Sequence, residues 1–382
     1  MAYLNVTVDS TYIDSTLTNF PIGIELDSTD TILFGLGPTA YEGFHFTVSG
    51  VECYAHIDIW DMTNEKAVVW VLVPSVSSSS DTIIKIENVG DDNTAYVGIS
   101  GSTPAETVYD SNAVGVWHMS EDPSAGNVLD ATANSYDAVP GTTYSSSYWD
   151  YGGFGKAIDF TFLASSAANQ GLNVPYNSDF NIQNLTVLAM VKPNAINQLD
   201  LIAVKRYASA SPPYNSFGLD IANSYYRFFI NNVISNSSGP PTTDWAILVG
   251  TYDGSNRKFY IDGVLDSDVS QSITIPYTSL GFFIADYGNN FEFGGRIAEV
   301  HLYNDAKSAA WIKAISNNLL GNLISSKTLV TPPPGAEVFG QISISGKNVD
   351  ILQIQIVDKG KWRIVDNVYM LIDKDWRLNI IS

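Results

Sequence analysis

Cysteine is nearly missing from the 382-residue sequence: Cys53 is the only one, so no disulfide can form within the chain. Basic residues are also scarce, because 19 lysines and arginines stand against 40 aspartates and glutamates, giving a net charge of −21. A phosphate backbone requires stripes of lysine or arginine, and an anionic membrane surface repels an acidic chain. These absences exclude nucleic acid as a partner and leave a divalent cation, a glycan or another protein.

Long apolar runs are absent too. No segment approaches the roughly 20 residues that a membrane-spanning helix needs. Residues 1–8 alternate like a strand and lack the basic and apolar regions of a secretory signal. We therefore expect no membrane insertion and a chain that is made and folded in the cytoplasm.

Short apolar runs, separated by Ser, Thr, Asn and Gly, make up most of the sequence. Hydrophobic residues account for 45% and aromatic residues for 12% of the chain, a mixture that favours strands and turns over helices. The length fits two or three domains. We predict an all-β protein.

The first part of the chain contains four predicted strands. Residues 20–26 and 54–60 alternate with period two, 67–74 form a continuous apolar run that ends at a proline, and 81–87 follow a serine-rich loop. With Trp60-Asp61 before the apolar run, this pattern resembles a domain of unknown function that often precedes concanavalin A-like domains. The resemblance implies an N-terminal β-sandwich domain over 1–108.

The middle of the chain contains seven motifs in a fixed order. They are Val116–Asp122, Asp130–Ala138, Gly155–Phe160, Leu172–Pro175, Phe180–Val187, Trp245–Leu265 and Gly295–Asn304. Together they resemble the laminin-G-like branch of the concanavalin A-like lectin/glucanase superfamily, which implies a jelly-roll sandwich over 109–325. Asp253-Gly254 and Asp262-Gly263 predict tight hairpins. Ile312, Ile315 and Leu319 share one face of a predicted short helix, which Ser308 caps and Gly321 ends.

The end of the chain has a different composition. Residues 336–382 contain six acidic and six basic side chains, whereas 1–335 contain 13 basic and 34 acidic ones. Residues 326–335 form a predicted proline-rich linker. Beyond it, Trp362-Arg363 and Trp376-Arg377 belong to a period-14 repeat of strand, turn and strand, a C-terminal Trp-containing β-repeat that resembles bacteriophage tail and fibre proteins.

No motif in the sequence supports a catalytic function. The glucanases of the superfamily have an E-x-D-x-x-E strand, which is absent here, and Glu299 stands alone on its strand. The four histidines, at positions 45, 56, 118 and 301, are scattered, and we interpret them as ordinary strand positions rather than a metal cluster or triad. Cys53 is predicted to be a buried small hydrophobe. We predict that the protein is not an enzyme.

Two kinds of binding site have candidate residues. Calcium is the expected structural ion, because laminin-G-like domains often hold one; candidate ligands are Asp130, Asn134 and Asp137, or Asp286 and Asn289, although all are also ordinary surface turn residues. Carbohydrate needs an aromatic platform in a loop. The candidates are Tyr148, Trp149, Asp150, Tyr151, Tyr207 and Tyr214, and the alternative is that these aromatics are buried against a neighbouring domain or subunit.

Taken together, these resemblances imply a bacteriophage virion structural protein: a tail fibre, head fibre or capsid decoration protein that attaches to a host-surface glycan. Its expected partners are other virion proteins and further copies of itself. The copies are expected to form a homo-oligomer, and a trimer is the usual state of a fibre. The alternatives are a bacterial cell-surface or secreted glycan-binding protein and a structural spacer without a ligand.

Overall fold

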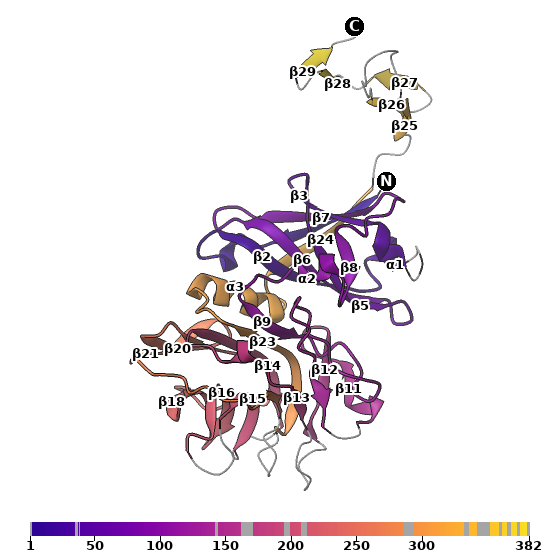
Figure 1. Cartoon of the computed structure of the whole chain (residues 1–382). Helices are drawn as coiled ribbons and strands as arrows, with labels where there is room; N and C mark the ends of the chain where they lie inside the picture. The colour runs from indigo at the N-terminus through magenta and orange to yellow at the C-terminus, as the bar shows by residue number, and fades with distance from the viewer. Residues whose placement is uncertain are drawn as a thin grey trace. The chain divides into compact units, whose positions relative to one another are not determined.

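The computed structural model describes residues 2–34, 37, 39–141, 144–161, 171–194, 199–207, 212–285 and 293–331, and the backbone of the strands within 336–379. Residues 3–328 form one compact unit, and Met1–Ala2 with Leu329–Ser382 form a second. The first unit contains two β-sandwiches and the second contains small hairpins, so the all-β prediction is confirmed (Figure 1). No helix in the described part of the chain is long and apolar enough to cross a membrane.

The N-terminal sandwich has two sheets. Its outer sheet contains β24 (Ile324–Val330), β1 (Tyr3–Val8), β7 (Thr82–Asn88), β3 (Phe44–Val48) and β4 (Val51–Glu52), in that order. Its inner sheet contains β2 (Leu17–Leu26), β6 (Lys66–Val76), β5 (Ala55–Asp61) and β8 (Val97–Ile99), with β8 parallel to β5. The predicted strands are therefore present. Cys53 is buried, as predicted.

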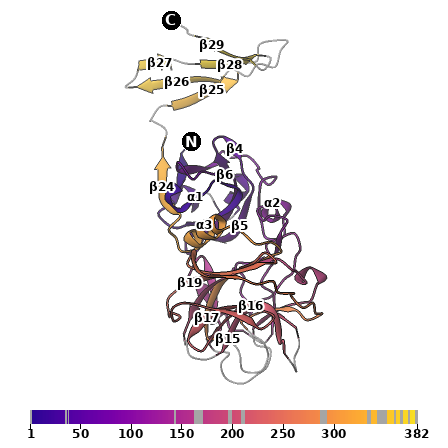
Figure 2. The same cartoon turned by 90° about the vertical axis from the view of Figure 1, so that its left-hand side faces the viewer.

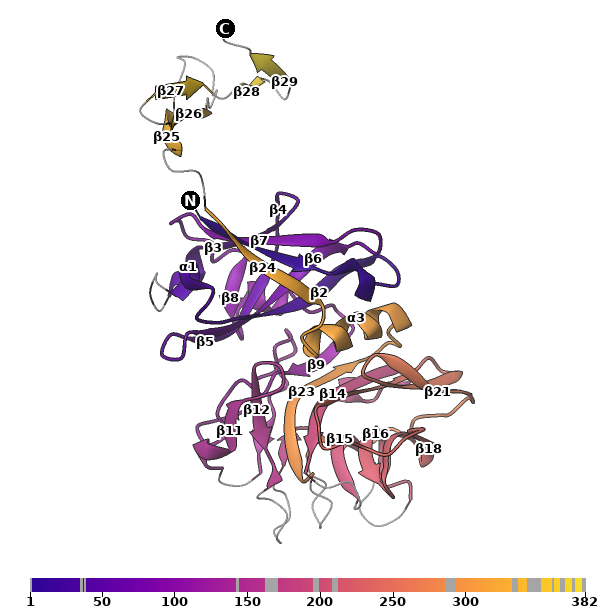
Figure 3. The same ribbon diagram turned by 180° about the vertical axis from the view of Figure 1, so that it is seen from behind.

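Strand β24 follows the jelly roll in sequence but completes the N-terminal sandwich. It lies beside β1 at the edge of the outer sheet, where Figure 3 shows it in orange among purple strands. Its Lys327 donates to the Asp30 carboxylate at 2.5 Å and to the Glu25 carbonyl at 3.1 Å. Residues 326–330, which we expected in the linker, are therefore part of a strand.

The jelly roll also has two sheets. The proximal sheet contains β11 (Trp149–Tyr151), β12 (Lys156–Asp159), β23 (Gly295–Tyr303), β14 (Leu185–Pro193), β19 (Ala246–Tyr252), β20 (Asn256–Ile261) and β21 (Val264–Ser270), and β9 (Ala113–Trp117) also pairs with β23. The distal sheet contains β10 (Val139–Pro140), β13 (Leu172–Val174), β22 (Phe282–Ile284), β15 (Asp200–Arg206), β16 (Asn215–Ala222), β17 (Tyr225–Ile230) and β18 (Val233–Asn236). Asp262 and Gly263 have φ angles of 51° and 79°, as a tight β20–β21 hairpin requires.

The inner sheet and the proximal sheet face each other across the junction between the two sandwiches. Residues 67–71 of β6 and 185–191 of β14 are buried at every position, which explains why their sequences are continuous apolar runs rather than alternating ones. A single apolar core contains residues from both sandwiches, including Trp70, Met190 and Ala298.

The helix α3 (Ala309–Leu319) contacts β2 and β19 and lies between the sandwiches (Figure 2). It begins and ends as predicted, because Ser308 Oγ accepts from the Trp311 amide at 3.2 Å and Gly321 has a φ of 75°. The Asn318 side chain donates to the Gly23 carbonyl at 2.8 Å and accepts from its amide at 2.7 Å. A Cβ at Gly23 would lie 2.6 Å from the Phe154 ring, so this close approach requires glycine.

Two further helices, α1 (Thr31–Phe34) and α2 (Thr103–Glu106), are single turns that we did not predict. Four 3₁₀ turns accompany them: η1 (Ser10–Tyr12), η2 (Ala40–Gly43), η3 (Ser146–Tyr148) and η5 (Ser178–Phe180). In the second unit, β25 (Ala336–Gln341), β26 (Leu352–Asp358) and β27 (Lys361–Ile364) form one sheet, and β28 (Val368–Ile372) and β29 (Asp375–Asn379) form another. The hairpins β26–β27 and β28–β29 match the predicted repeat.

Candidate functional site

The first predicted aromatic segment, residues 148–151, lies at the junction between the sandwiches. The Trp149 indole donates to the Met119 carbonyl at 2.9 Å, and the Lys156 ammonium lies 3.6 Å from the Trp149 ring centroid. Tyr151 donates to the Asp61 carboxylate of the N-terminal sandwich at 2.9 Å. Trp149 and Tyr151 are half-buried, whereas Asp150 is exposed. Tyr151 therefore contacts the neighbouring domain, whereas the Trp149 ring packs against the jelly roll's own core.

The second predicted segment, which contains Tyr207 and Tyr214, lies at one end of the distal sheet. Two further tyrosines, which the sequence analysis missed, lie at the same end. Tyr214 is 44% exposed, and Tyr176 and Tyr277 are 43% and 58% exposed. Tyr207 is half-buried, and its amide donates to the Tyr214 carbonyl at 2.9 Å. We call Tyr176, Tyr207, Tyr214 and Tyr277 the tyrosine surface.

Polar side chains hold the loops of the tyrosine surface together. Asn181 donates to the Tyr176 hydroxyl at 3.1 Å and accepts from the Thr278 amide at 3.1 Å. Thr278 in turn donates to the Tyr207 carbonyl at 3.1 Å. These bonds link three loops that are distant in sequence, so they fix the backbone that carries the rings.

Lys205 lies beneath this surface. Its ammonium is buried, donates to the carbonyls of Thr278 and Leu280, and lies 5.0 Å from the Tyr176 ring centroid. Burial lowers the pKa of Lys205 to about 8, because a low-dielectric site disfavours its charged form. Exposed rings beside fixed polar groups suit a ligand with an apolar face and several hydroxyls.

The predicted calcium ligands occupy one loop of the jelly roll. The Asp130 carboxylate accepts from the amides of Val116, Thr132 and Tyr136 at 2.9–3.0 Å. Asp137 accepts from the Asp130 amide at 3.0 Å, and Asn134 donates to the carbonyls of Ala113 and Val114. The structure thus brings Asp130 and Asp137 together as organisers of the loop, and calcium there stays a prediction. Asp286 and Asn289 lie outside the described residues.

Three of the four histidines converge at the junction, so our interpretation of them as scattered strand positions is wrong. His118 Nδ1 and His301 Nε2 lie 2.7 Å and 2.9 Å from the same oxygen, Glu299 Oε2. The Tyr109 hydroxyl lies 2.6 Å from His118 Nε2 and 2.8 Å from His56 Nδ1. We call these five residues the junction network.

Two further hydroxyls lie at the ends of the junction network. Ser100 Oγ lies 2.9 Å from His56 Nε2, and the Tyr303 hydroxyl lies 3.3 Å from His301 Nδ1. With Glu299 ionised, both histidine N–H groups donate to it, and each remaining ring nitrogen accepts from a tyrosine hydroxyl. Trp70 of β6 stacks on His118 with ring centroids 4.8 Å apart, so residues of both sandwiches enclose the network.

Burial determines the protonation of the junction network. It lowers the pKa of His118 to about 3 and also lowers those of His56 and His301. It raises the pKa of Glu299 to about 7, although hydrogen bonding and attraction to His301 oppose the rise. The histidines are therefore neutral at pH 7.

One group among the described residues has ligand atoms close enough together to hold a metal ion, all within 4.8 Å of one another. It consists of His118, Glu299 and His301. Two histidine nitrogens and a carboxylate oxygen would suit a transition metal. The ligand atoms of all three residues are already hydrogen-bonded to one another, so the arrangement is complete as a hydrogen-bond network.

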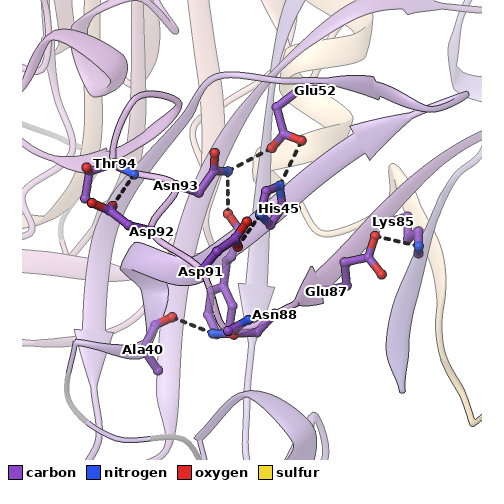
Figure 4. Close-up of polar contacts among 12 residues, drawn as sticks. Ala40, His45, Glu52, Lys85, Glu87, Asn88, Asp91, Asp92, Asn93 and Thr94 are labelled. Atoms are coloured by element: carbon purple, nitrogen blue, oxygen red, sulfur yellow. Dashed lines mark hydrogen bonds and ion pairs between the residues drawn. The ribbon is translucent and has the colours of Figure 1, made fainter. Parts of the chain in front are cut away.

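The fourth histidine, His45, lies apart on the outer sheet (Figure 4). Its two ring nitrogens lie 3.1 Å from the Glu52 carboxylate and 3.0 Å from the Asp91 carboxylate. Partial burial lowers its pKa, but the hydrogen bonds to Asp91 and Glu52 outweigh that effect, so the pKa is raised. His45 thus stabilises the surface loop that contains Asp91.

One sequence signal could have revealed the junction network. Glu299 and His301 occupy alternate positions of the largely apolar segment 297–303 and therefore point to the same face of the strand. Two buried polar side chains on one face must have partners. No comparable local signal marks Tyr176 or Tyr277, which approach Tyr207 and Tyr214 only in the folded chain.

Comparisons with known proteins agree with this architecture. Residues 166–313 match the family model of the concanavalin A-like lectin/glucanases superfamily. Among curated proteins, none matches the sequence.

Several solved structures are similar to the chain. Domain 4 of a Geobacillus stearothermophilus extracellular arabinanase, solved with arabinotriose, is 15% identical with a TM-score of 0.41, over 55% of this chain and 100% of that one. Trypanosoma rangeli sialidase is 13% identical with a TM-score of 0.42, over 65% of this chain and 42% of the sialidase. A carbohydrate-binding module of a Ruminococcus gnavus sialidase, bound to sialyllactose, is 14% identical with a TM-score of 0.34, over 40% of this chain and 95% of the module.

The family match covers the described strands from β13 to β23 and the first turn of α3, which include strands of both jelly-roll sheets. Residues 166–313 therefore belong to a laminin-G-like, lectin-like jelly-roll domain of the concanavalin A-like lectin/glucanase superfamily.

Proposed function

We propose that the protein is an adhesion component of a bacteriophage virion, and that the jelly roll binds a host-surface glycan through the tyrosine surface. The observation that carries the glycan proposal is the set of three exposed tyrosines, Tyr176, Tyr214 and Tyr277, at one end of the distal sheet, where the Tyr176 ring lies beside the buried Lys205. Aromatic rings stack on the apolar faces of sugars, while fixed polar groups select among hydroxyls.

The virion part of the proposal is supported by the second unit. Its hairpins β26–β27 and β28–β29 contain the repeated Trp-Arg pairs at Trp362 and Trp376, whose sequence resembles phage tail and fibre repeats. Two-stranded hairpins bury little apolar surface alone, so we propose that copies of this unit associate. The rival proposal is a bacterial cell-surface or secreted glycan-binding protein. Such a protein would bind glycan through the same tyrosine surface but would not belong to a virion.

The proposal assigns binding without catalysis. The nearest candidate for a catalytic carboxylate in the jelly roll, Glu299, is buried, and its Oε2 interacts with two histidines. A structural calcium ion at the Asp130 loop stays part of the proposal and is not required for the tyrosine surface.

Replacing Tyr277 by alanine should weaken glycan binding about 5- to 150-fold, the loss that corresponds to the about 1–3 kcal/mol measured for aromatic rings that stack on nucleobases. The measurement is a glycan array with the full chain, followed by calorimetry on the best ligand. Tyr225→Ala is the matched control: Tyr225 is 40% exposed but lies at the opposite end of β16–β17 from Tyr214. Equal losses in the two variants would contradict the assignment of the surface.

Removing residues 336–382 should convert the expected oligomer into a monomer, because residues 3–328 already form a compact unit by themselves. Light scattering on the full and shortened chains measures the mass directly. A monomer of 41.6 kDa for the full chain would contradict the virion proposal and favour the rival glycan-binding protein.

A further inference from the structure

A pocket of about 270 Å³ lies at one edge of the jelly roll, between the β20–β21 hairpin and the loop that connects β18 to β19. Its inner part contains Tyr226 and Ala246, which belong to the jelly-roll core, and Ile261, which packs against that core. Val264 and Leu265 line its outer part. The pocket is therefore a place where the apolar core of the jelly roll reaches the surface.

The outer part of the pocket is both apolar and accessible. Val264 and Leu265 are 69% and 47% exposed, although they are consecutive in β21. Consecutive side chains of a strand point to opposite faces, so the chain covers neither face of β21 at this point. As the last strand of the proximal sheet, β21 pairs with β20 alone. An edge strand of this kind can add an extended segment of another protein.

Polar contacts hold the two sides of the pocket in place. The Asp266 carboxylate accepts from the Ser238 amide at 2.9 Å and from the Ser238 hydroxyl at 2.5 Å. The Tyr226 hydroxyl donates to the Thr242 carbonyl at 3.2 Å and accepts from the Thr242 amide at 3.3 Å. The pocket is thus formed by contacts of the chain itself, so a ligand needs little rearrangement to bind.

The charges around the pocket are negative. Burial raises the pKa of the Tyr226 hydroxyl, and the nearby carboxylates of Asp262 and Asp244 raise it further. Asp266 adds a third carboxylate, and among the described residues no lysine or arginine lines the pocket. The surroundings of the pocket therefore favour a ligand that carries positive charge beside an apolar group.

The same charges decide which kind of protein fits this edge. A second copy of the chain would bring the same carboxylates and a net charge of −21, so two copies would repel each other here. Charged side chains on an edge strand block pairing with chains of like charge. A basic segment is attracted instead, and its apolar side chain would cover the exposed part of the core.

We propose that this pocket binds an extended segment of a basic protein, with one large apolar side chain in the pocket and lysine or arginine side chains beside Asp244 and Asp266. The segment would lie along β21 and continue the proximal sheet. Tyr226 is paired with Ile221, at the opposite end of β16 from Tyr214. The inference is therefore independent of the tyrosine surface and does not rest on glycan binding.

The test measures fluorescence anisotropy of a labelled heptapeptide in which lysine alternates with leucine, on the full chain at physiological salt. Two matched peptides replace every lysine by glutamate or every leucine by serine. The lysine–leucine peptide should bind about tenfold more tightly than either of them.

Variants of the chain locate the binding. Leu265→Ser should weaken binding of the lysine–leucine peptide about tenfold, because an apolar contact is lost. Asp266→Asn keeps an acceptor for Ser238 but removes the charge, and should weaken binding about two- to fivefold. Val51→Ser is the matched control, because Val51 is 56% exposed on β4 of the N-terminal sandwich. Near-UV circular dichroism confirms that the variants fold.

Four results would overturn the proposal: no binding of the lysine–leucine peptide, equal binding of the glutamate peptide, parent-like affinity in Leu265→Ser, or an equal loss in Val51→Ser. Tyr277→Ala should leave peptide binding unchanged, so failure of this proposal and failure of the glycan proposal are separate results. Loss of peptide binding in Tyr277→Ala alone would assign the peptide to the tyrosine surface instead.

Discussion

A Glu299→Ala variant should lose about 2–6 kcal/mol of unfolding free energy, because two buried hydrogen bonds lose their shared acceptor. Glu299 Oε2 lies within 2.9 Å of nitrogens on both His118 and His301. Its removal leaves two buried N–H groups without an acceptor, each at about 1–3 kcal/mol. Urea denaturation of the full chain, followed by intrinsic Trp fluorescence, measures the change.

Two further variants complete this experiment. Glu299→Gln keeps one carbonyl acceptor and should lose less than Glu299→Ala. Asp268→Ala removes a carboxylate from an exposed pair with Lys258, 3.4 Å away, and should cost less than about 1 kcal/mol. If Glu299→Ala were as stable as Asp268→Ala, the junction network would not hold the sandwiches together.

Acidification below pH 6.5 should weaken the contribution of the junction network to the stability of the chain. The folded state lowers the pKa values of His56, His118 and His301, that of His118 to about 3, whereas histidine in an unfolded chain titrates near 6.5. Below about pH 6.5, the unfolded chain therefore binds protons at these histidines that the folded chain binds only at lower pH. Each such proton removes about 1.4 kcal/mol of unfolding free energy per pH unit of acidification.

Glu299 acts in the opposite direction. Its pKa is raised to about 7 in the folded chain, so between about pH 4.5 and 7 the folded state binds a proton that the unfolded state does not. That contribution stabilises the folded chain at low pH and is lost as the pH rises through 7. Three histidines outweigh one glutamate, so the network as a whole loses stability on acidification.

Variants isolate the histidine contribution. His118→Gln should reduce the pH slope of the unfolding free energy by one proton, about 1.4 kcal/mol per pH unit between 6.5 and 5. His45→Gln should act in the opposite direction and above pH 6.5, because the raised pKa of His45 gives a stabilisation that is lost as the pH rises through that pKa. The measurement is urea denaturation from pH 5 to pH values above 6.5. Identical slopes for the parent chain and His118→Gln would refute the assignment of a neutral buried His118.

Local patterns were sufficient to predict most of the secondary structure. The alternation in 54–60, the Asp262-Gly263 turn and the spacing of Ile312, Ile315 and Leu319 each depend on neighbours within a few residues, and β5, the β20–β21 hairpin and α3 appear where expected. The seven motifs, taken in their fixed order along the chain, also predicted the jelly-roll fold.

The sites were less predictable because they are made by long-range contacts. His118 and Glu299 are 181 positions apart in sequence, and their hydrogen bond depends on the pairing of β9 with β23. Trp149 satisfied the sequence criteria for a sugar platform, but its ring packs against the jelly roll's own core and contacts Lys156. Which aromatic residues remain exposed is decided by that packing, which no local pattern encodes.

The position of β24 also sets the order in which the chain can be completed on the ribosome. Strand β1 is synthesised before the jelly roll, yet its neighbour β24 is synthesised only after the entire jelly roll. Until then β1 is an open edge, and open edges recruit strands from other chains. The nascent protein is therefore most vulnerable to mispairing during synthesis of the jelly roll, and the arrival of residues 324–330 ends that period.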